Sequence, residues 1–190
     1  MDLASPLPDD RALLAAFAHE PSRDRAFTEI VRAYGERLYW HIRRMVTEHE
    51  DANDVLQNVF IKAWKGLQDF RGESGLYTWL YRIATNETIS WLDARKRRAV
   101  VPLDVGNNGT SNGPADRIAS QEGFNGRRVE WQLQHAVNQL PEKQRLVFNL
   151  RYFDEMPYEQ MSGVLGTSVG ALKASYHHAV KKIEAFFKAL

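Results

Sequence analysis

Aromatic and cationic side chains gather in the segment 70–86. It contains four aromatic rings, two arginines and an asparagine, on what the pattern predicts to be a short loop and the helix that it opens. Every base has a π-face, and stacking on an aromatic ring contributes about 1–3 kcal/mol per base to single-strand binding. Consecutive cations follow at residues 95–98 and suit phosphate groups. The segment therefore predicts a surface that holds opened DNA.

A helix packed into an all-α core is the plain alternative for this segment, with Trp79, Leu80 and Ile83 pointing inward. Such packing accounts for part of the pattern, but it accounts poorly for the rings of Tyr77 and Tyr81. The residues that we expect to contact DNA are Phe70, Arg71, Ser74, Tyr77, Trp79, Tyr81, Arg82, Asn86, Lys96, Arg97 and Arg98.

Residues 157–183 predict two helices joined by a tight turn. Gly166 suits the left-handed position that ends the first helix, and Ser168 can cap the second. A helix in this setting can read base edges with its N-terminal half while its cations contact phosphates. The residues that we expect to contact DNA here are Ser168, Gly170, Lys173, Ser175, Tyr176, His177 and Lys181.

A plain helical hairpin with solvated lysines is the alternative for residues 157–183, because helix-turn-helix patterns often arise by chance. The coincidence of a capped turn, small residues and a polar face favours DNA binding. His177 and His178 do not predict a metal site, because adjacent helical residues point to different sides and no partner ligand lies nearby in the sequence.

The predicted helix 51–67 has a second, mixed face that its core side does not need. An apolar residue, Ile61, stands among polar side chains there, which suits docking onto a helix of another protein. Ordinary solvated surface is the alternative. The residues of this expected docking face are Asp54, Gln57, Asn58, Ile61 and Lys62.

Composition limits the possible classes of protein. The 190 residues, 44% of them hydrophobic, suit one domain or two small ones, and a net charge of +1 gives no overall signal for nucleic acid. Without cysteine, disulfides and thiolate metal sites are excluded. No signal pattern and no apolar run of about 20 residues is present, so we expect a cytoplasmic protein that does not insert into membranes.

Helical spacing recurs along the chain, and strand-like alternation is nearly absent. We expect four helices in the first half, starting near Asp9 or Asp10, at Asp24, at Asp51 and at Ser74, the last running to about Arg97. Helices then resume near Arg127 and after Pro141, with an inward stripe made of Leu146, Val147, Leu150 and Tyr152.

Glycine, asparagine and proline dominate residues 102–114 and predict a flexible linker. We therefore expect an all-α protein with two small helical domains, at 1–99 and 127–190, joined by a linker at 100–126. The helix-turn-helix belongs to the second domain.

Taken together, these segments resemble the extracytoplasmic-function sigma factors, the minimal two-domain class of bacterial transcription initiation factors. The resemblance runs from about Phe27 to Ile183. The segments that resemble sigma region two are DANDVLQNVFIKAW at 51–64, FRG at 70–72 and YTWLYRIATN at 77–86. The segments that resemble sigma region four are LPEKQR at 140–145, LRYF at 150–153 and the helix-turn-helix from Tyr158.

The resemblance implies a role for each predicted surface. The face around Asp54 would dock on the clamp helices of the largest subunit of core RNA polymerase. The loop after Phe70 and the helix to Asn86 would capture a flipped base of the promoter minus-ten element and hold the melted strand. The helix from Ser168 would enter the major groove at the minus-thirty-five element. An anti-sigma factor is a further partner that the family implies.

Two departures from the family pattern affect the second domain. Ser162 stands where the first helix of the motif usually has alanine, and the recognition helix lacks the arginines that many members carry. Because bidentate guanine contacts need arginine or lysine, we expect an altered or weaker minus-thirty-five consensus.

A stand-alone helix-turn-helix regulator and an enzyme are the competing functions. Such a regulator does not need the aromatic loop or the face around Asp54. No nucleophile–base arrangement, phosphate loop or metal-ligand spacing supports an enzyme, and no cofactor is expected. Scattered histidines at positions 19, 41, 49 and 135 are expected to be surface or packed residues.

Overall fold

The computed structural model describes residues 9–46, 48–100 and 126–190, and all regular structure within them is helical. Most of the predicted linker, residues 101–125, lies outside the described residues. The helices are α1 (Asp10–Ala18), α2 (Arg23–Arg43), α3 (His49–Gly66), α4 (Leu76–Val100), α5 (Gly126–Asn138), α6 (Glu142–Tyr152), α7 (Tyr158–Leu165) and α8 (Val169–Lys188), with short 3₁₀ turns η1 (Glu20–Ser22) and η2 (Leu67–Asp69). The all-α prediction is confirmed.

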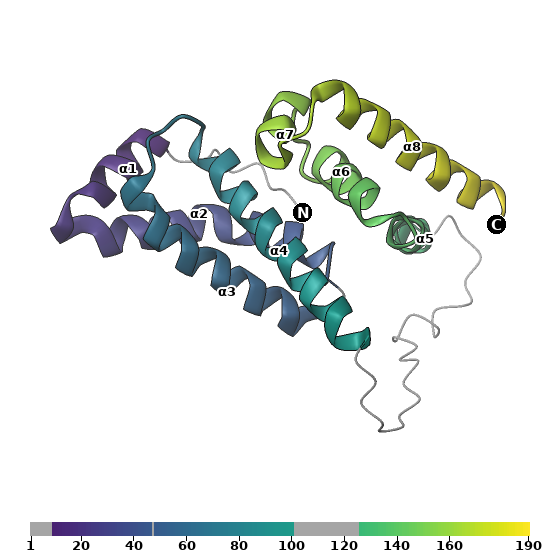
Figure 1. Cartoon of the computed structure of the whole chain (residues 1–190), viewed down its shortest axis with the longest axis horizontal. Coiled ribbons are helices and arrows are strands. Elements are labelled where there is room, and N and C mark those ends of the chain that lie inside the picture. Colours follow the sequence, from purple (N-terminus) through teal and green to yellow (C-terminus); the bar gives the residue numbers. More distant parts are fainter. Residues whose placement is uncertain (1–8, 47, 101–125) are drawn as a thin grey trace.

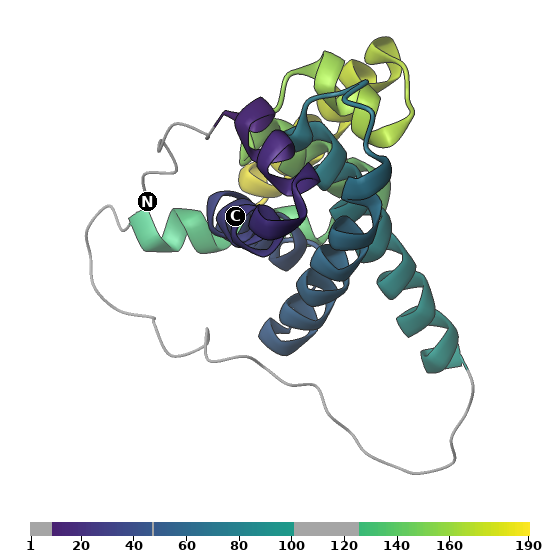
Figure 2. The same ribbon diagram turned by 90° about the vertical axis from the view of Figure 1, so that its left-hand side faces the viewer.

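Helices α1–α4 form a bundle that we call the first module (Figure 1). Apolar side chains at helical spacing bury one face of α2 and α3, as the sequence predicted. An aromatic cluster links Phe17 of α1, Phe27 of α2 and Trp64 of α3, with ring centroids 5.0–6.2 Å apart. Both phenylalanine rings meet Trp64 edge to face. Helix α4 packs on α3, and Figure 2 shows the two helices diverging away from the loop that joins them.

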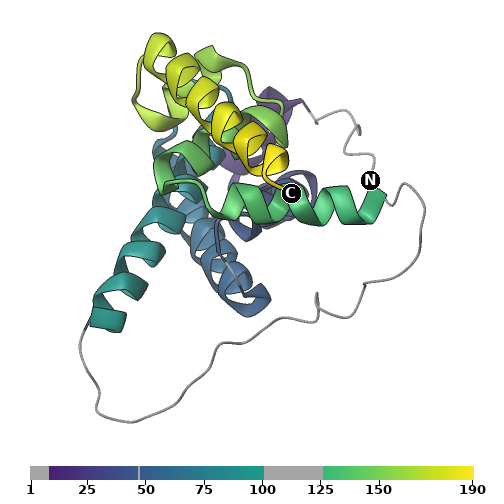
Figure 3. The same ribbon diagram turned by 90° about the vertical axis from the view of Figure 1, so that its right-hand side faces the viewer.

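Helices α5–α8 form the second module, in which α8 packs on α5 and α6 (Figure 3). Gly166 adopts φ +61° and its N–H donates to the Ser162 carbonyl at 2.9 Å, which ends α7. Ser168 then caps α8 through a hydrogen bond from Ala171 N at 3.4 Å. The predicted turn and cap of the helix-turn-helix are confirmed.

The two modules pack against each other, with α7 lying against α4. Buried side chains form a continuous apolar cluster that extends from the first module to Leu146, Leu150 and Met161 of the second. A second, smaller cluster around Val137, Phe148 and Ile183 belongs to the second module alone.

Several predicted boundaries are wrong by a few residues. Helix α2 begins at Arg23, so Asp24 lies in its first turn and is not its cap, and α3 begins at His49, not at Asp51. Tyr152, expected inward, is 50% exposed. The predicted cap at Ser74 is replaced by a hydrogen bond from Leu76 N to a carboxylate of α1, which local patterns cannot reveal.

Candidate nucleic-acid interface

A polar hollow of about 500 Å³ lies beside the loop that leads into α4. The half-buried rings of Phe70 and Trp79 form one wall, with centroids 5.0 Å apart, and Gly72 bends the loop with φ +71°. The hollow is lined by Asp69, Phe70, Arg71, Glu73, Ser74, Trp79 and Arg82. Five residues of the predicted DNA surface are therefore brought together around one concavity.

Tyr77 and Tyr81 lie on the side of α4 that meets the second module. Their rings are 4.4 Å apart, and Tyr81 also lies 5.0 Å from the buried ring of His41. Burial raises the pKa of both phenols, and the Asp154 carboxylate adds to the effect at Tyr81. Tyr81 is only 1% exposed, so the expectation that it faces DNA does not hold in this arrangement.

Arg82 and Thr78 touch the first helix of the helix-turn-helix. Arg82 Nε donates to the Gly163 carbonyl oxygen at 3.0 Å, and a Cβ added at Gly163 would meet Thr78 Cγ2 at 3.4 Å. Asn86, one turn beyond Arg82, is exposed. In this arrangement α7 covers part of the predicted strand-binding face of α4.

The basic end of α4 lies ten or more residues beyond Asn86, which corresponds to at least about 15 Å along a helix. Lys96 pairs with Glu142 of the second module, and this hydrogen bond raises the pKa of the ammonium group. Arg97 and Arg98 are exposed and available to phosphates. The hollow and the basic end could therefore contact different stretches of one nucleic-acid strand.

The recognition helix α8 exposes one polar face that begins at its N-terminus. Gly170, Lys173, His177 and Lys181 are exposed along it, with helical spacing, and Ser175 is half-buried at its edge. Tyr176 differs from the prediction: its ring stacks on Phe148 with centroids 5.8 Å apart, and burial raises its pKa. Tyr176 therefore packs α8 on α6 and contributes little to the exposed face.

Helix α3 exposes its mixed face fully. All five residues predicted for docking are exposed, and Ile61, at 46%, is among the most exposed large apolar residues of the described chain. Lys62 of this face pairs with Glu87 of α4. This geometry can receive a helix of another protein.

A buried ionic cluster joins the modules at Asp154, which follows α6. Its carboxylate accepts from Arg44 Nη1 at 2.8 Å and lies 3.1 Å from His41 Nδ1, while His41 Nε2 lies 3.1 Å from Thr85 Oγ1. The side chains of His41 and Asp154 are 0% and 4% exposed. We call these four residues the Asp154 cluster.

Comparison with known proteins identifies both modules. The family models of sigma-70 region 2 and sigma-70 region 4 match residues 30–98 and 130–183. The RNA polymerase sigma-H factor of Pseudomonas aeruginosa is 32% identical over 170 residues, which cover 87% of this chain and 88% of that protein. The ECF RNA polymerase sigma-E factor of Escherichia coli K12 is 31% identical over 164 residues, covering 84% and 85%.

The chain belongs to the extracytoplasmic-function sigma factors. It directs core RNA polymerase to specific promoters and assists promoter melting when transcription starts, and the alternative of a stand-alone regulator is not supported.

Two solved structures have the same fold, each with a TM-score of 0.67. CnrH, in complex with the cytosolic domain of CnrY, is 26% identical, and the match covers 95% of this chain and 97% of CnrH. RpoE, in complex with the anti-sigma factor NepR from Bartonella quintana, is 23% identical, with 85% and 96% covered.

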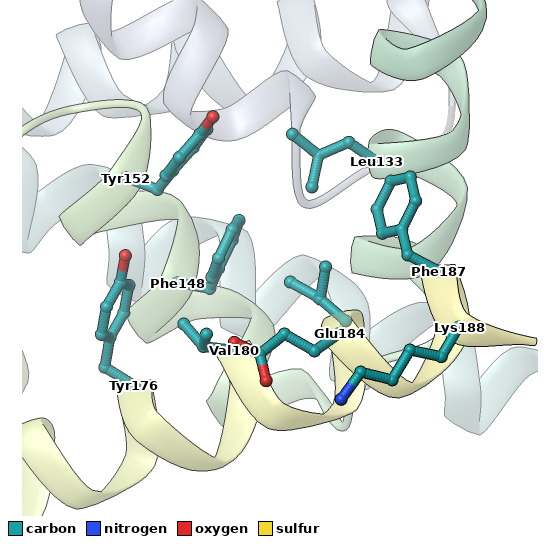
Figure 4. Close-up of a pocket in the computed structure, with 9 residues that line it drawn as sticks. Leu133, Phe148, Tyr152, Tyr176, Val180, Glu184, Phe187 and Lys188 are labelled. Atoms are coloured by element: carbon teal, nitrogen blue, oxygen red, sulfur yellow. The ribbon is translucent and has the colours of Figure 1, made fainter.

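The second module of this sigma factor also carries an apolar groove of about 480 Å³, which sequence reasoning missed (Figure 4). Its lining comes from α5, α6 and α8: Leu133, Phe148, Tyr152, Tyr176, Val180, Ile183, Glu184, Phe187 and Lys188. The exposed ring of Tyr152 stacks on Phe148 with centroids 5.1 Å apart. Tyr152 was assigned to the core because helical spacing does not distinguish a groove from a buried face.

Two further residues of the hollow, Asp69 and Glu73, were not predicted. Asp69 directly precedes Phe70, and Glu73 lies between Phe70 and the start of α4. These positions were a usable signal, because side chains of one short loop often share a site. Among the described residues, no group of three or more acidic or histidine side chains could hold a metal ion. No helix within the described ranges is long and apolar enough to cross a membrane.

Proposed function

We propose that the sigma factor divides promoter recognition between residues 1–99 and residues 127–190, with 100–126 as the connection. The first part binds core polymerase and the minus-ten element, and the second binds the minus-thirty-five element. The hollow beside α4 carries this proposal, because it combines aromatic walls, cations and hydrogen-bond acceptors within one concavity.

In the hollow, a base flipped out of the minus-ten element lies against Phe70 and Trp79. Flipping costs a few kcal/mol, and stacking on an aromatic ring returns about 1–3 kcal/mol. Arg71 supplies a cation for the adjoining phosphate. Asp69 and Glu73 are acceptors, which suit the amino groups on base edges and not phosphates. The basic end of α4, at Lys96, Arg97 and Arg98, contacts phosphates outside the hollow.

At the minus-thirty-five element, the exposed face of α8 lies in the major groove. Lys173 and Lys181 contact phosphates or guanine edges, while Ser168, Gly170, Ser175 and His177 approach bases closely. Without arginine on this face, fewer bidentate guanine contacts form. The consensus at this element is therefore weaker than in members with an arginine-rich helix.

Core polymerase docks on the exposed face of α3. Asp54, Gln57, Asn58, Ile61 and Lys62 meet the clamp helices of the largest subunit in a helix-to-helix contact. Ile61 supplies an apolar centre and the flanking polar groups fix the register.

The packed arrangement of the modules is a closed state that must open for promoter binding. In it, Tyr81 is buried and Arg82 is bonded to α7. Gln144 Oε1, Arg145 Nε and Asn149 Oδ1 of α6 are buried without hydrogen-bond partners. A permanent core seldom leaves polar atoms in this condition, whereas interfaces between mobile domains are more polar. Arg145 and Asn149 also donate to the main-chain oxygens of Met45 and Arg44 in the first module, so separation of the modules frees these two side chains together with the face of α4.

An anti-sigma factor binds the apolar groove of the second module through an amphipathic helix. The groove is open and largely apolar, with Glu184 and Lys188 among its lining residues (Figure 4). CnrH, which shares this fold, was solved with the cytosolic domain of CnrY, and RpoE was solved with the anti-sigma factor NepR. The sigma factor acts in the cytoplasm with the polymerase and has no catalytic activity of its own, because polymerisation belongs to the core enzyme.

Base capture is tested with holoenzyme, made from core polymerase and the full chain, on a promoter fragment carrying 2-aminopurine at the minus-ten element. We expect fluorescence to rise when wild-type holoenzyme binds. Arg71→Ala removes an exposed side chain from the lining of the hollow, so it should reduce the rise without changing affinity for core. Equal loss of base capture and core affinity would contradict the assignment of the hollow.

A further inference from the structure

The start of α4 is held by a side chain of α1, sixty-six residues earlier in the chain. The first N–H groups of a helix have no partner within the helix and need an external acceptor. Asp10 Oδ2 accepts from Leu76 N at 3.2 Å, while the Trp79 N–H makes the first bond back to Gly75 O at 3.1 Å. The negative charge of Asp10 also complements the positive end of the helix dipole.

The carboxylate of Asp10 is itself held in place. Its other oxygen, Oδ1, accepts from the hydroxyl of Tyr34 at 2.5 Å, and Tyr34 is completely buried in α2. Burial, followed by the hydrogen bond to Asp10, raises the pKa of Tyr34. At the other end of α1, Phe17 packs edge-on against Trp64 at 5.3 Å. Helix α1 is therefore fixed at both ends and presents Asp10 in one orientation.

Leu76, whose N–H is capped by Asp10, lies in the sequence between two residues that line the hollow. Ser74 precedes it by two residues and Trp79 follows it by three. The loop 70–75 is thus attached at its start by contact between Phe70 and Trp79, and at its end by the bond between Asp10 and Leu76. Loss of the second attachment would let the first turn of α4 fray and would change the width of the hollow.

We propose that Asp10 is a positioning residue for base capture, which keeps the hollow preformed by fixing where α4 begins. This inference rests on the proposed function of the hollow. It assigns a role in promoter recognition to α1, which lies before the segment 30–98 that matches sigma-70 region 2.

Asp9 provides a matched control one residue away. Its carboxylate accepts from Arg11 N at 3.0 Å and so caps α1 itself, with no contact to α4. Asp9→Ala and Asp10→Ala therefore remove the same chemical group from the same turn. Only Asp10→Ala removes the acceptor of Leu76.

The test uses full-length variants in holoenzyme and measures binding to a single-stranded minus-ten oligonucleotide, with affinity for core measured in parallel. Asp10→Ala should weaken strand binding about five- to tenfold, as the loss of a helix cap does, while core affinity stays constant. Asp10→Asn keeps a carbonyl acceptor and should restore most of the binding. Asp9→Ala should bind the strand as wild type does.

Hydrogen exchange of residues 76–79 in the free chain supplies a second measurement. Asp10→Ala should speed exchange there, and Asp9→Ala should not. Unchanged strand binding in Asp10→Ala, or a matching loss of core affinity, would overturn the positioning role. If wild-type holoenzyme itself failed to bind the strand, the proposed function of the hollow would be wrong, regardless of the hydrogen-exchange rates measured at residues 76–79.

Discussion

Arg82 Nε donates a hydrogen bond to the main-chain oxygen of Gly163 across 3.0 Å. Arg82 lines the hollow that we assign to the minus-ten element, and Gly163 lies in α7, the first helix of the helix-turn-helix. The same contact therefore joins the two modules and engages a residue that we propose for DNA binding. In the proposed mechanism, promoter binding and the closed arrangement compete for Arg82.

Replacement of Asp154 should open the closed arrangement. Asp154→Ala removes the shared partner of His41 and Arg44 and leaves a cation without compensation at a nearly buried position, which typically costs about 3 kcal/mol or more. We expect a larger radius of gyration in small-angle scattering and faster association with core polymerase. Glu142→Gln, which affects the exposed pair with Lys96, is the control and should leave both quantities nearly unchanged. An unchanged radius of gyration in Asp154→Ala would show that other contacts hold the modules together.

Charge reversal on α3 should separate core binding from DNA binding. Asp54→Lys places the opposite charge on the exposed docking face, so we expect its affinity for core to fall at least tenfold, the effect of about 1.4 kcal/mol. Asp24→Lys, exposed near the start of α2, should bind core normally. A pull-down with purified core distinguishes the two variants, and equal affinities would remove the docking role of α3.

Local patterns in the sequence were sufficient for the helix-turn-helix. Gly166 must supply a positive φ and Ser168 must supply an oxygen to the first turn of α8, and both requirements are met within a few residues of chain. The inward stripes of α2 and α3 were predictable for the same reason, because helical spacing alone determines them. The hollow beside α4 was only partly predictable, since Phe70 and Trp79 were identified but Asp69 and Glu73 were not.

Contacts between distant segments could not be read from such patterns. Ser74 looked like the cap of α4, but the acceptor is Asp10, brought there by the packing of α1 on α2. Tyr81 looked available for DNA because periodicity does not report that a second module will cover it. The pairing of Asp154 with His41 and Arg44 joins residues more than 100 positions apart, and no local rule fixes it.

The face of α8 gives a prediction about salt dependence. Lys173→Ala should weaken binding of the minus-thirty-five duplex, and if Lys173 contacts phosphate the slope of log affinity against log salt should fall by about one. Lys65 is exposed on α3 of the first module, away from α8, so Lys65→Ala is the control. Binding measured at several salt concentrations separates the variants. Identical behaviour would place another face of α8 on the DNA.

The buried tyrosines give a prediction for alkaline pH. Because burial raises the pKa of Tyr34 and Tyr81 above that of an unfolded tyrosine, their contribution to stability is complete below about pH 10. Above that pH, stability should fall by about 1.4 kcal/mol per pH unit for each tyrosine that ionises only on unfolding. Tyr81→Phe should make this decline shallower than in wild type in denaturant titrations. A decline of equal slope would mean that Tyr81 is not protected from ionisation in the folded chain.

Run-off transcription tests the account most directly. Core RNA polymerase is combined with a pool of promoter fragments from the source genome, with and without the full chain, and the starts of the transcripts are aligned. The account predicts specific transcripts only when the chain is present, with two shared elements upstream, and a sharp loss of those transcripts with Asn86→Ala. Binding to duplex DNA without core, and no specific transcript with core, would contradict it.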